Sequence, residues 1–92
     1  MDLDGWRGRI DALNAKLVDL LNERARCALA IAAVKKKHGL PVHDPKREQE
    51  VLENVMAQNE GPLSTEALHR IFQCIIEEHR RLGEQHRSEG DA

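Results

Sequence analysis

Arg24 and Lys35 are the residues of this sequence whose type and position most clearly suggest chemistry. On a helical wheel of about 100° per residue, aliphatic side chains from Ile10 to Ile31 form one stripe, and both cations fall inside it. A cation in apolar surroundings needs an anionic partner or access to water. Each alone could reach solvent along its own stem or pair with a glutamate of another helix. Together they favour an anion-binding cavity inside a helical bundle.

The spacing of these cations fits one small ligand. Lys35 follows Arg24 by eleven residues, which is about 16 Å along a helix axis, so two long side chains could bracket a single anion. Arg7 lies near the same stripe but about 25 Å from Arg24, too far to share that ligand within one chain. In an antiparallel or crossed dimer, Arg7 could enter the partner's cavity.

Two further groups of polar residues are candidates. Asp44, Arg47 and Glu48 open the second expected helix, where alone they are typical of an N-cap followed by first-turn surface charges. His79 lies on the apolar stripe of the third expected helix. It either contacts a ligand or is a core histidine whose hydrogen bonds are satisfied.

Helix-forming residues dominate the sequence, and helix breakers cluster at residues 38–45 and 59–64. These clusters predict an all-α chain of one long and two shorter helices. The first spans about residues 4–37, the second begins at Asp44 with Pro45 at its first position, and the third begins at Ser64. We expect a single domain over residues 1–92, with a polar tail at about 84–92 that frays.

The first helix is too long for a compact monomer. It would extend about 50 Å, whereas a compact chain of this length has a radius of gyration of about 12 Å. Two shorter helices cannot cover its apolar stripe. We therefore expect an intertwined homodimeric helical bundle.

Composition argues against several classes of function. The chain has 92 residues, 14 basic against 16 acidic side chains, and a net charge of −2, so it carries no strongly basic arm for nucleic acid. Aromatic residues are too few for base stacking. No apolar stretch is long enough to span a membrane. The five histidines lack metal-ligand spacing, so we expect no metal. An acidic N-terminus without an apolar signal core, and the isolated Cys27 and Cys74, favour the cytoplasm.

Five short motifs occur in order between about residues 3 and 82. They are Arg7-x-x-Ile10-Asp11-x-Leu13-Asn14, Leu20-Leu21-Asn22-Glu23-Arg24, Ile31-x-x-x-Lys35, Pro41-Val42-x-Asp44-x-x-Arg47-Glu48 and Ile71-Phe72-x-x-Ile75-Ile76. Each is weak alone, but the ordered set resembles the all-helical AroQ class of chorismate mutase.

This resemblance implies an isomerase that converts chorismate to prephenate in the biosynthesis of phenylalanine and tyrosine. The reaction is a unimolecular [3,3] (Claisen) rearrangement, which needs positioning and electrostatic stabilisation but no cofactor, metal or covalent intermediate. The resemblance also implies a three-helix chain, a homodimer with two shared active sites, and possible fusion or association with another enzyme of the shikimate pathway.

The resemblance also assigns roles to individual residues. Arg24 would grip one substrate carboxylate, Arg7 of the other chain the second, and Lys35 the ether oxygen and a carboxylate. Glu48 would accept from the ring hydroxyl with Asp44 nearby, and Arg47 would complete a cationic wall. His79 would either contact a substrate carboxylate or be a core histidine with satisfied hydrogen bonds.

Two positions depart from the family pattern. Gly83 stands where the family usually has a Gln or Glu that donates to the ether oxygen, although Glu84 and Gln85 follow directly. Losing one such donor can cost about 10²–10³ in rate. His79 stands where a Ser is common.

Two other functions therefore stay open on the sequence. One is a non-catalytic or partner-activated regulatory module that binds chorismate or prephenate. The other is an isochorismate-pyruvate lyase of the same fold, against which the Asp44-x-x-Arg47-Glu48 motif argues. The chain could also be one domain of a bifunctional protein.

Overall fold

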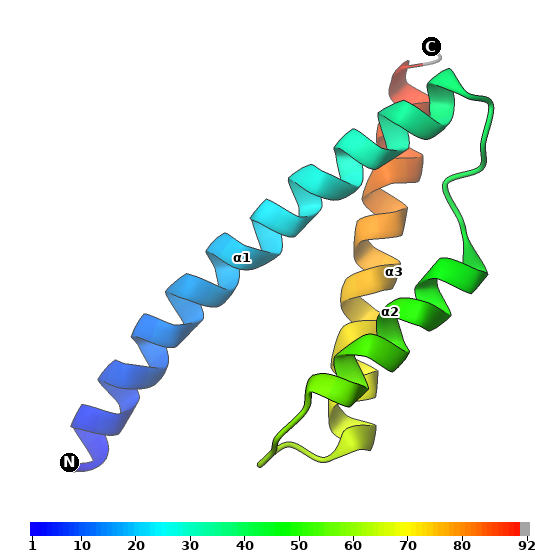
Figure 1. Cartoon of the computed structure of the whole chain (residues 1–92). Coiled ribbons are helices and arrows are strands. Elements are labelled where there is room, and N and C mark those ends of the chain that lie inside the picture. Colours follow the sequence, from blue (N-terminus) through cyan, green and yellow to red (C-terminus); the bar gives the residue numbers. More distant parts are fainter. Residues whose placement is uncertain (91–92) are drawn as a thin grey trace.

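Three helices and no strands make up the computed structural model, which describes residues 1–90. Helix α1 spans Leu3–Lys37, α2 spans Pro45–Gln58 and α3 spans Thr65–Gly90 (Figure 1). The predicted all-α chain of one long and two shorter helices is confirmed. Both helix-breaking clusters form the connections where they were expected.

Each helix begins at a side chain that caps free backbone N–H groups. A carboxylate oxygen of Asp2 accepts from Gly5 N at 2.8 Å, and one of Asp44 accepts from Arg47 N at 3.1 Å. The hydroxyl of Ser64 accepts from Ala67 N at 3.1 Å. Such caps are typically worth about 1 kcal/mol each. They set the starting points that the sequence predicted for the second and third helices.

A Schellman motif ends α1 directly after the lysine predicted to bind a ligand. Gly39 has a φ of +67°, and its N–H donates to Lys36 O at 3.1 Å. The next N–H, of Leu40, donates to Lys35 O at 2.8 Å. This left-handed conformation is easy only for glycine. The motif turns the chain back toward α2 while Lys35 is still on the last helical turn.

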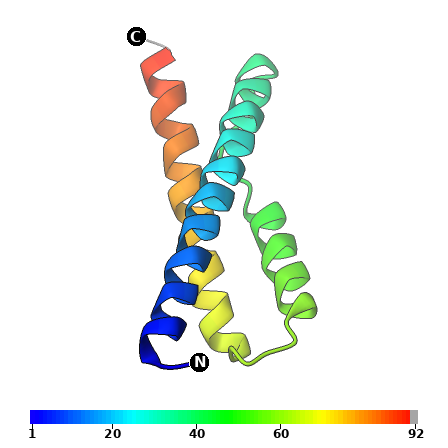
Figure 2. The ribbon, with the colours of Figure 1, turned by 90° about the vertical axis from the view of Figure 1, so that its left-hand side faces the viewer.

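Helix α3 packs against both α1 and α2. Helices α1 and α3 run in the same direction and α2 runs oppositely (Figures 1 and 2). The N-terminal half of α1 extends away from the other two helices (Figure 1). The chain is correspondingly elongated, with a radius of gyration of 16.4 Å and extents of 54 × 27 × 14 Å.

The core of the single chain is thin. Among the described residues, the hydrophobic side chains with the lowest exposure are Ala32 at 3% and Ile76 at 7%. Large apolar residues along α1 remain exposed, including Trp6 at 54%, Ile10 at 56% and Leu17 at 55%. A soluble monomer rarely exposes such a continuous apolar face.

The end of α3 differs from the sequence prediction of a fraying tail after Gly83. The helix continues to Gly90, and residues 91–92 of the predicted tail lie outside the described residues. Gly83 itself is buried where α3 crosses α1, and a Cβ there would lie 3.3 Å from Ala32 Cβ and 3.4 Å from Val42 Cγ1. The helix continues past Gly83 because this glycine is packed closely against its neighbours and because most residues after it favour the helical conformation.

None of the helices within residues 1–90 combines the length and the apolar composition needed to cross a membrane.

Candidate active site

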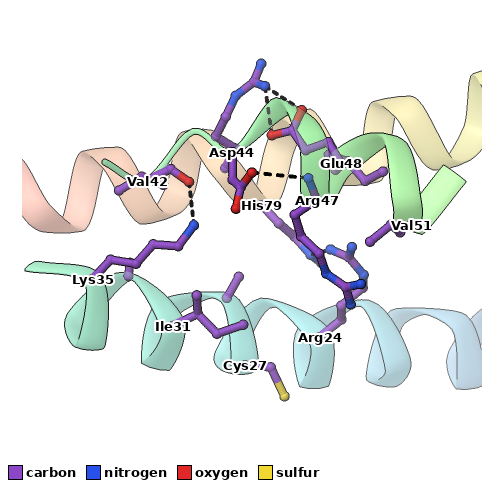
Figure 3. Close-up of a pocket in the computed structure, with 14 residues that line it drawn as sticks. Arg24, Cys27, Ile31, Lys35, Val42, Asp44, Arg47, Glu48, Val51 and His79 are labelled. Atoms are coloured by element: carbon purple, nitrogen blue, oxygen red, sulfur yellow. Dashed lines mark hydrogen bonds and ion pairs between the residues drawn. The ribbon is translucent and has the colours of Figure 1, made fainter. Parts of the chain in front are cut away.

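A cavity of about 270 Å³ lies between α1 and the start of α2, with α3 behind it (Figure 3). Its polar lining residues are Arg24, Lys35, Asp44, Arg47, Glu48, His79 and Arg80. Its apolar lining residues are Cys27, Ala28, Ile31, Ala32, Val42, Val51 and Ile76. The structure therefore brings together every predicted site residue except Arg7. Arg7 is exposed on the projecting half of α1, as expected of a residue that cannot reach this cavity within one chain.

Arg24 reaches the cavity from the middle of α1 and is oriented by α3. Its Nη1 lies 2.6 Å from Nδ1 of His79 (Figure 3). A guanidinium only donates hydrogen bonds, so Nδ1 accepts and His79 is neutral with its proton on Nε2. His79 therefore has a hydrogen-bond partner and holds Arg24 in place. The sequence alone could not decide between this role and a direct contact to a ligand.

Electrostatics at Arg24 and His79 favour an anionic ligand. Burial, and then the guanidinium of Arg47, lower the pKa of Arg24, which still stays charged at neutral pH. Burial lowers the pKa of His79 as well, and the charge of Arg24 adds to this effect. Each shift means that positive charge is disfavoured in the cavity. An anion between Arg24 and Arg47 would be stabilised by both.

Lys35 occupies the opposite end of the cavity from Arg24. Its Nζ donates to the carbonyl oxygen of Val42 at 2.9 Å, so the turn after α1 positions the ammonium group (Figure 3). A lysine ammonium has three donors, and this bond uses one. The two ends of the predicted cation pair therefore flank the cavity, with Ile31 and Cys27 on α1 between them.

The first turn of α2 contributes the acidic residues. Asp44 caps the helix, and Arg47 is exposed and pairs with Glu50 at 3.5 Å. Glu48 is different because its side chain is only 24% exposed and faces α3. Arg47 is therefore exposed like an ordinary first-turn surface charge, although it also lines the cavity. Glu48 is not a surface charge, because its side chain is largely buried.

Arg80 also lines the cavity, although its position in the sequence was not among the predicted site residues. Its Nη1 lies 2.8 Å from Oε1 and 3.0 Å from Oε2 of Glu48, across the gap between α3 and α2. Its sequence position offered a signal. Arg80 lies four residues after Ile76 and three before Gly83, both buried, so it is a third cation on an apolar stripe.

The departure at Gly83 is not repaired by its neighbours in this chain. Glu84 and Gln85 are exposed, neither lines the cavity, and the amide nitrogen of Gln85 lies 3.4 Å from a carboxylate oxygen of Glu89. A shift of register that would bring them in is absent, because Gly83 is packed on Ala32 and Val42.

The charged residues that line the cavity suit an anionic ligand with two carboxylates. Among its described lining residues, Arg24, Lys35, Arg47 and Arg80 are cationic, whereas Asp44 and Glu48 are anionic. The excess of positive charge matches a dicarboxylate. Within residues 1–90, no group of three or more His, Cys, Asp or Glu side chains could hold a metal ion.

Residues 6–84 match the protein family described as chorismate mutase type II. This match covers most of the chain and contains every residue of the cavity. The chain belongs to this family.

Known chorismate mutases resemble the chain in sequence and in structure. It is 40% identical over 79 residues to a bifunctional chorismate mutase/prephenate dehydratase of Stutzerimonas stutzeri, covering 80% of this chain and 22% of that protein. The chorismate mutase of Thermus thermophilus (form II) superposes with a TM-score of 0.87 at 34% identity, over 89% of this chain and 93% of that one. That of Helicobacter pylori, solved in complex with prephenate, gives a TM-score of 0.83 at 35% identity, over 90% of each chain.

Proposed function

We propose that this chain is a chorismate mutase that isomerises chorismate to prephenate. The observation that carries this proposal is the placement of Arg24 and Lys35 at two ends of one cavity, with Glu48 on a third side, in a member of the chorismate mutase type II family. Structural similarity to a chorismate mutase solved with prephenate supports it.

Positioning of the substrate is the first contribution of the site. Chorismate is a flexible dicarboxylate, and its side chain must fold over the ring before the ether C–O bond breaks and the new C–C bond forms. Arg24, held by His79, offers one carboxylate a planar guanidinium. Glu48 accepts from the ring hydroxyl, with Asp44 and Arg47 beside it. Because both parts of the substrate are held when it binds, the conformational entropy is lost on binding and no longer contributes to the barrier of the reaction.

Electrostatic stabilisation is the second contribution. Negative charge develops on the ether oxygen as its bond to carbon breaks. Lys35 places an ammonium at the far end of the cavity, where its remaining N–H groups donate to that oxygen and to a carboxylate. No proton is gained or lost overall, since the reaction only redistributes bonds within one molecule.

We also propose that the enzyme is a homodimer with shared sites. The exposed apolar face of α1 supports this, since Leu13, Leu17 and Leu20 are 46%, 55% and 59% exposed in the single chain. A second copy crossing α1 would cover this face and bring Arg7 to the open side of the partner's cavity. There Arg7 binds the second carboxylate.

Sedimentation at micromolar concentration tests the dimer. We expect a species of twice the 10.4 kDa chain mass. Leu17→Glu, which places a charge on the exposed face of α1, should shift the protein toward monomer. A wild-type species of single-chain mass would contradict the proposed dimer.

Two observations support our proposals for the location and the partners of the enzyme. Cys27 and Cys74 are free, exposed thiols, which supports a cytoplasmic location. The similarity to a bifunctional chorismate mutase/prephenate dehydratase supports fusion or association with an enzyme that consumes prephenate.

The decisive experiment follows chorismate with the purified protein by loss of ultraviolet absorbance and identifies the product. Formation of prephenate at a rate well above that of the uncatalysed reaction is the expected result. Tight binding of chorismate without turnover would overturn the proposal and point to a regulatory module.

A further inference from the structure

Arg80 and Glu48 form the ion pair that links α3 to α2 at the cavity. Both carboxylate oxygens of Glu48 lie within 3.0 Å of one guanidinium nitrogen, and the two side chains are only 26% and 24% exposed. A guanidinium that approaches both oxygens leaves the carboxylate little freedom to rotate. Glu48 still has lone pairs for a further donor, because a carboxylate offers about four acceptor positions.

The charge of Glu48 would otherwise oppose the proposed ligand. A carboxylate that faces a cavity for a dicarboxylate repels it, and this repulsion grows as water is excluded. A second ionisable neighbour of Glu48 is His43, whose Nε2 lies 3.6 Å from Oε1 and whose side chain is 50% exposed. Arg80 is closer, more buried and permanently charged, so it is the dominant counter-charge.

We propose that Arg80 is a positioning residue for the mutase reaction: it orients Glu48 toward the substrate hydroxyl and cancels its charge. The inference rests on the proposed function. It assigns no bond between Arg80 and the substrate. Arg80 acts through Glu48, so its contribution depends on the presence of the Glu48 carboxylate.

Steady-state kinetics of four variants test this dependence. Arg80→Leu keeps an apolar stem and removes the charge, and we expect kcat/KM to fall about ten- to hundredfold. Arg80→Lys keeps the charge but replaces the planar guanidinium by a compact ammonium, and its kcat/KM should lie between those of Arg80→Leu and the wild type. In the Glu48→Gln background, Arg80→Leu should change kcat/KM by less than about threefold, because the partner is already lost.

Arg81→Leu is the matched control. Arg81 is the next residue on α3, and it pairs with Glu78 on the exposed surface, with 68% of its side chain accessible. We expect its kcat/KM to stay within about twofold of the wild type. Circular dichroism and the sedimentation of each variant show whether it folds and assembles. If Arg80→Leu does not fold, the comparison rests on Arg80→Lys and Arg80→Gln.

The outcomes separate the two proposals. If the wild type does not convert chorismate, whether or not it binds prephenate in calorimetry, the proposed function fails and the role of Arg80 in the reaction fails with it. If the wild type is active but Arg80→Leu matches Arg81→Leu, only the role of Arg80 is wrong. Equal losses from Arg80→Leu with and without Glu48 would also overturn it, because Arg80 would then act independently of Glu48.

Discussion

A hydrogen bond fixes the position of the charged group in each of three cavity residues, Arg24, Lys35 and Arg80. Arg24 is held by His79, Lys35 by the Val42 carbonyl, and Arg80 by Glu48. Long cationic side chains lose considerable rotamer entropy when a ligand immobilises them. Because the contacts of Arg24 and Lys35 restrict these two side chains before a ligand arrives, the ordering cost of binding is smaller.

Substitution of the two principal cations gives the first prediction. Arg24→Ala and Lys35→Ala should each lower kcat/KM for chorismate by about 10²–10³-fold or more, because each removes a charged contact to the substrate. Lys37→Ala, at an exposed lysine in the same last turn of α1, is the control and should behave like wild type. Near-wild-type kinetics in Arg24→Ala or Lys35→Ala would refute the proposed site.

His79 gives a prediction about pH. Its pKa is lowered in the folded chain, first by burial and then by Arg24, so the unfolded chain binds the proton more readily. The contribution of neutral His79 to stability is therefore complete above the unfolded pKa of about 6.5 and is lost as pH falls below it. Unfolding midpoints measured from pH 7.5 to pH 5 should fall.

His79→Asn isolates this effect, because an amide oxygen can accept from Arg24 without titrating. Its midpoints should decline less steeply with acid than those of the wild type. Identical pH dependence in both proteins would show that the Arg24–His79 contact does not control acid stability.

Helix ends and helix crossings place these side chains. The Schellman motif at Gly39 stops α1 just after Lys35, and the Asp44 cap starts α2 four residues before Glu48. The crossing at Gly83 brings α3 close enough to α1 for His79 to meet Arg24. The geometry of the cavity therefore depends on the crossing of α1 and α3 at Gly83 as well as on the positions of the cationic side chains.

Enlarging Gly83 tests the crossing. Even a Cβ would lie 3.3 Å from Ala32 Cβ, so Gly83→Leu should separate α1 from α3 and destabilise the fold by about 1–3 kcal/mol. Ser88→Leu, at an exposed position on the same helix, should have a much smaller effect. Urea unfolding at one fixed protein concentration measures both. Equal stability of Gly83→Leu and wild type would mean that the crossing adjusts without cost.

The whole molecule is elongated, and much of its apolar surface lies outside its own core. The projecting half of α1 carries Trp6, Ile10 and Leu17 into solvent, together with Arg7. A second chain that covers this surface would gain about 25 cal/mol for each Å² of apolar area removed from water. The same contact would complete the cavity with a cation from another chain.

Mixed dimers test this sharing of sites. Arg7→Ala and Arg24→Ala proteins should each be nearly inactive, yet a heterodimer of the two contains one intact site. After subunit exchange, random mixing restores about a quarter of the wild-type sites. Activity no greater than the average of the separate variants, with exchange verified by mass, would argue against a site shared between chains.

The candidate site was predictable where its residues share one helix. Arg24 and Lys35 stood out because the wheel places both on the apolar stripe of α1, and Asp44 and Pro45 marked the start of α2. The pair of Arg80 and Glu48 did not stand out, since its members lie 32 residues apart on different helices. A helical wheel shows on which face of its helix a residue lies, but it does not show which other helix packs against that face.

The amino-acid sequence alone determined the three helices, their starting points and the family motifs. Caps, breakers and apolar periodicity act over a few residues, so they can be recognised before any packing is known. Only the tertiary structure decided that His79 holds Arg24, that Arg80 holds Glu48 and that Gly83 is buried against α1. These contacts depend on the distance and register between packed helices, which are set by side chains distant in the chain.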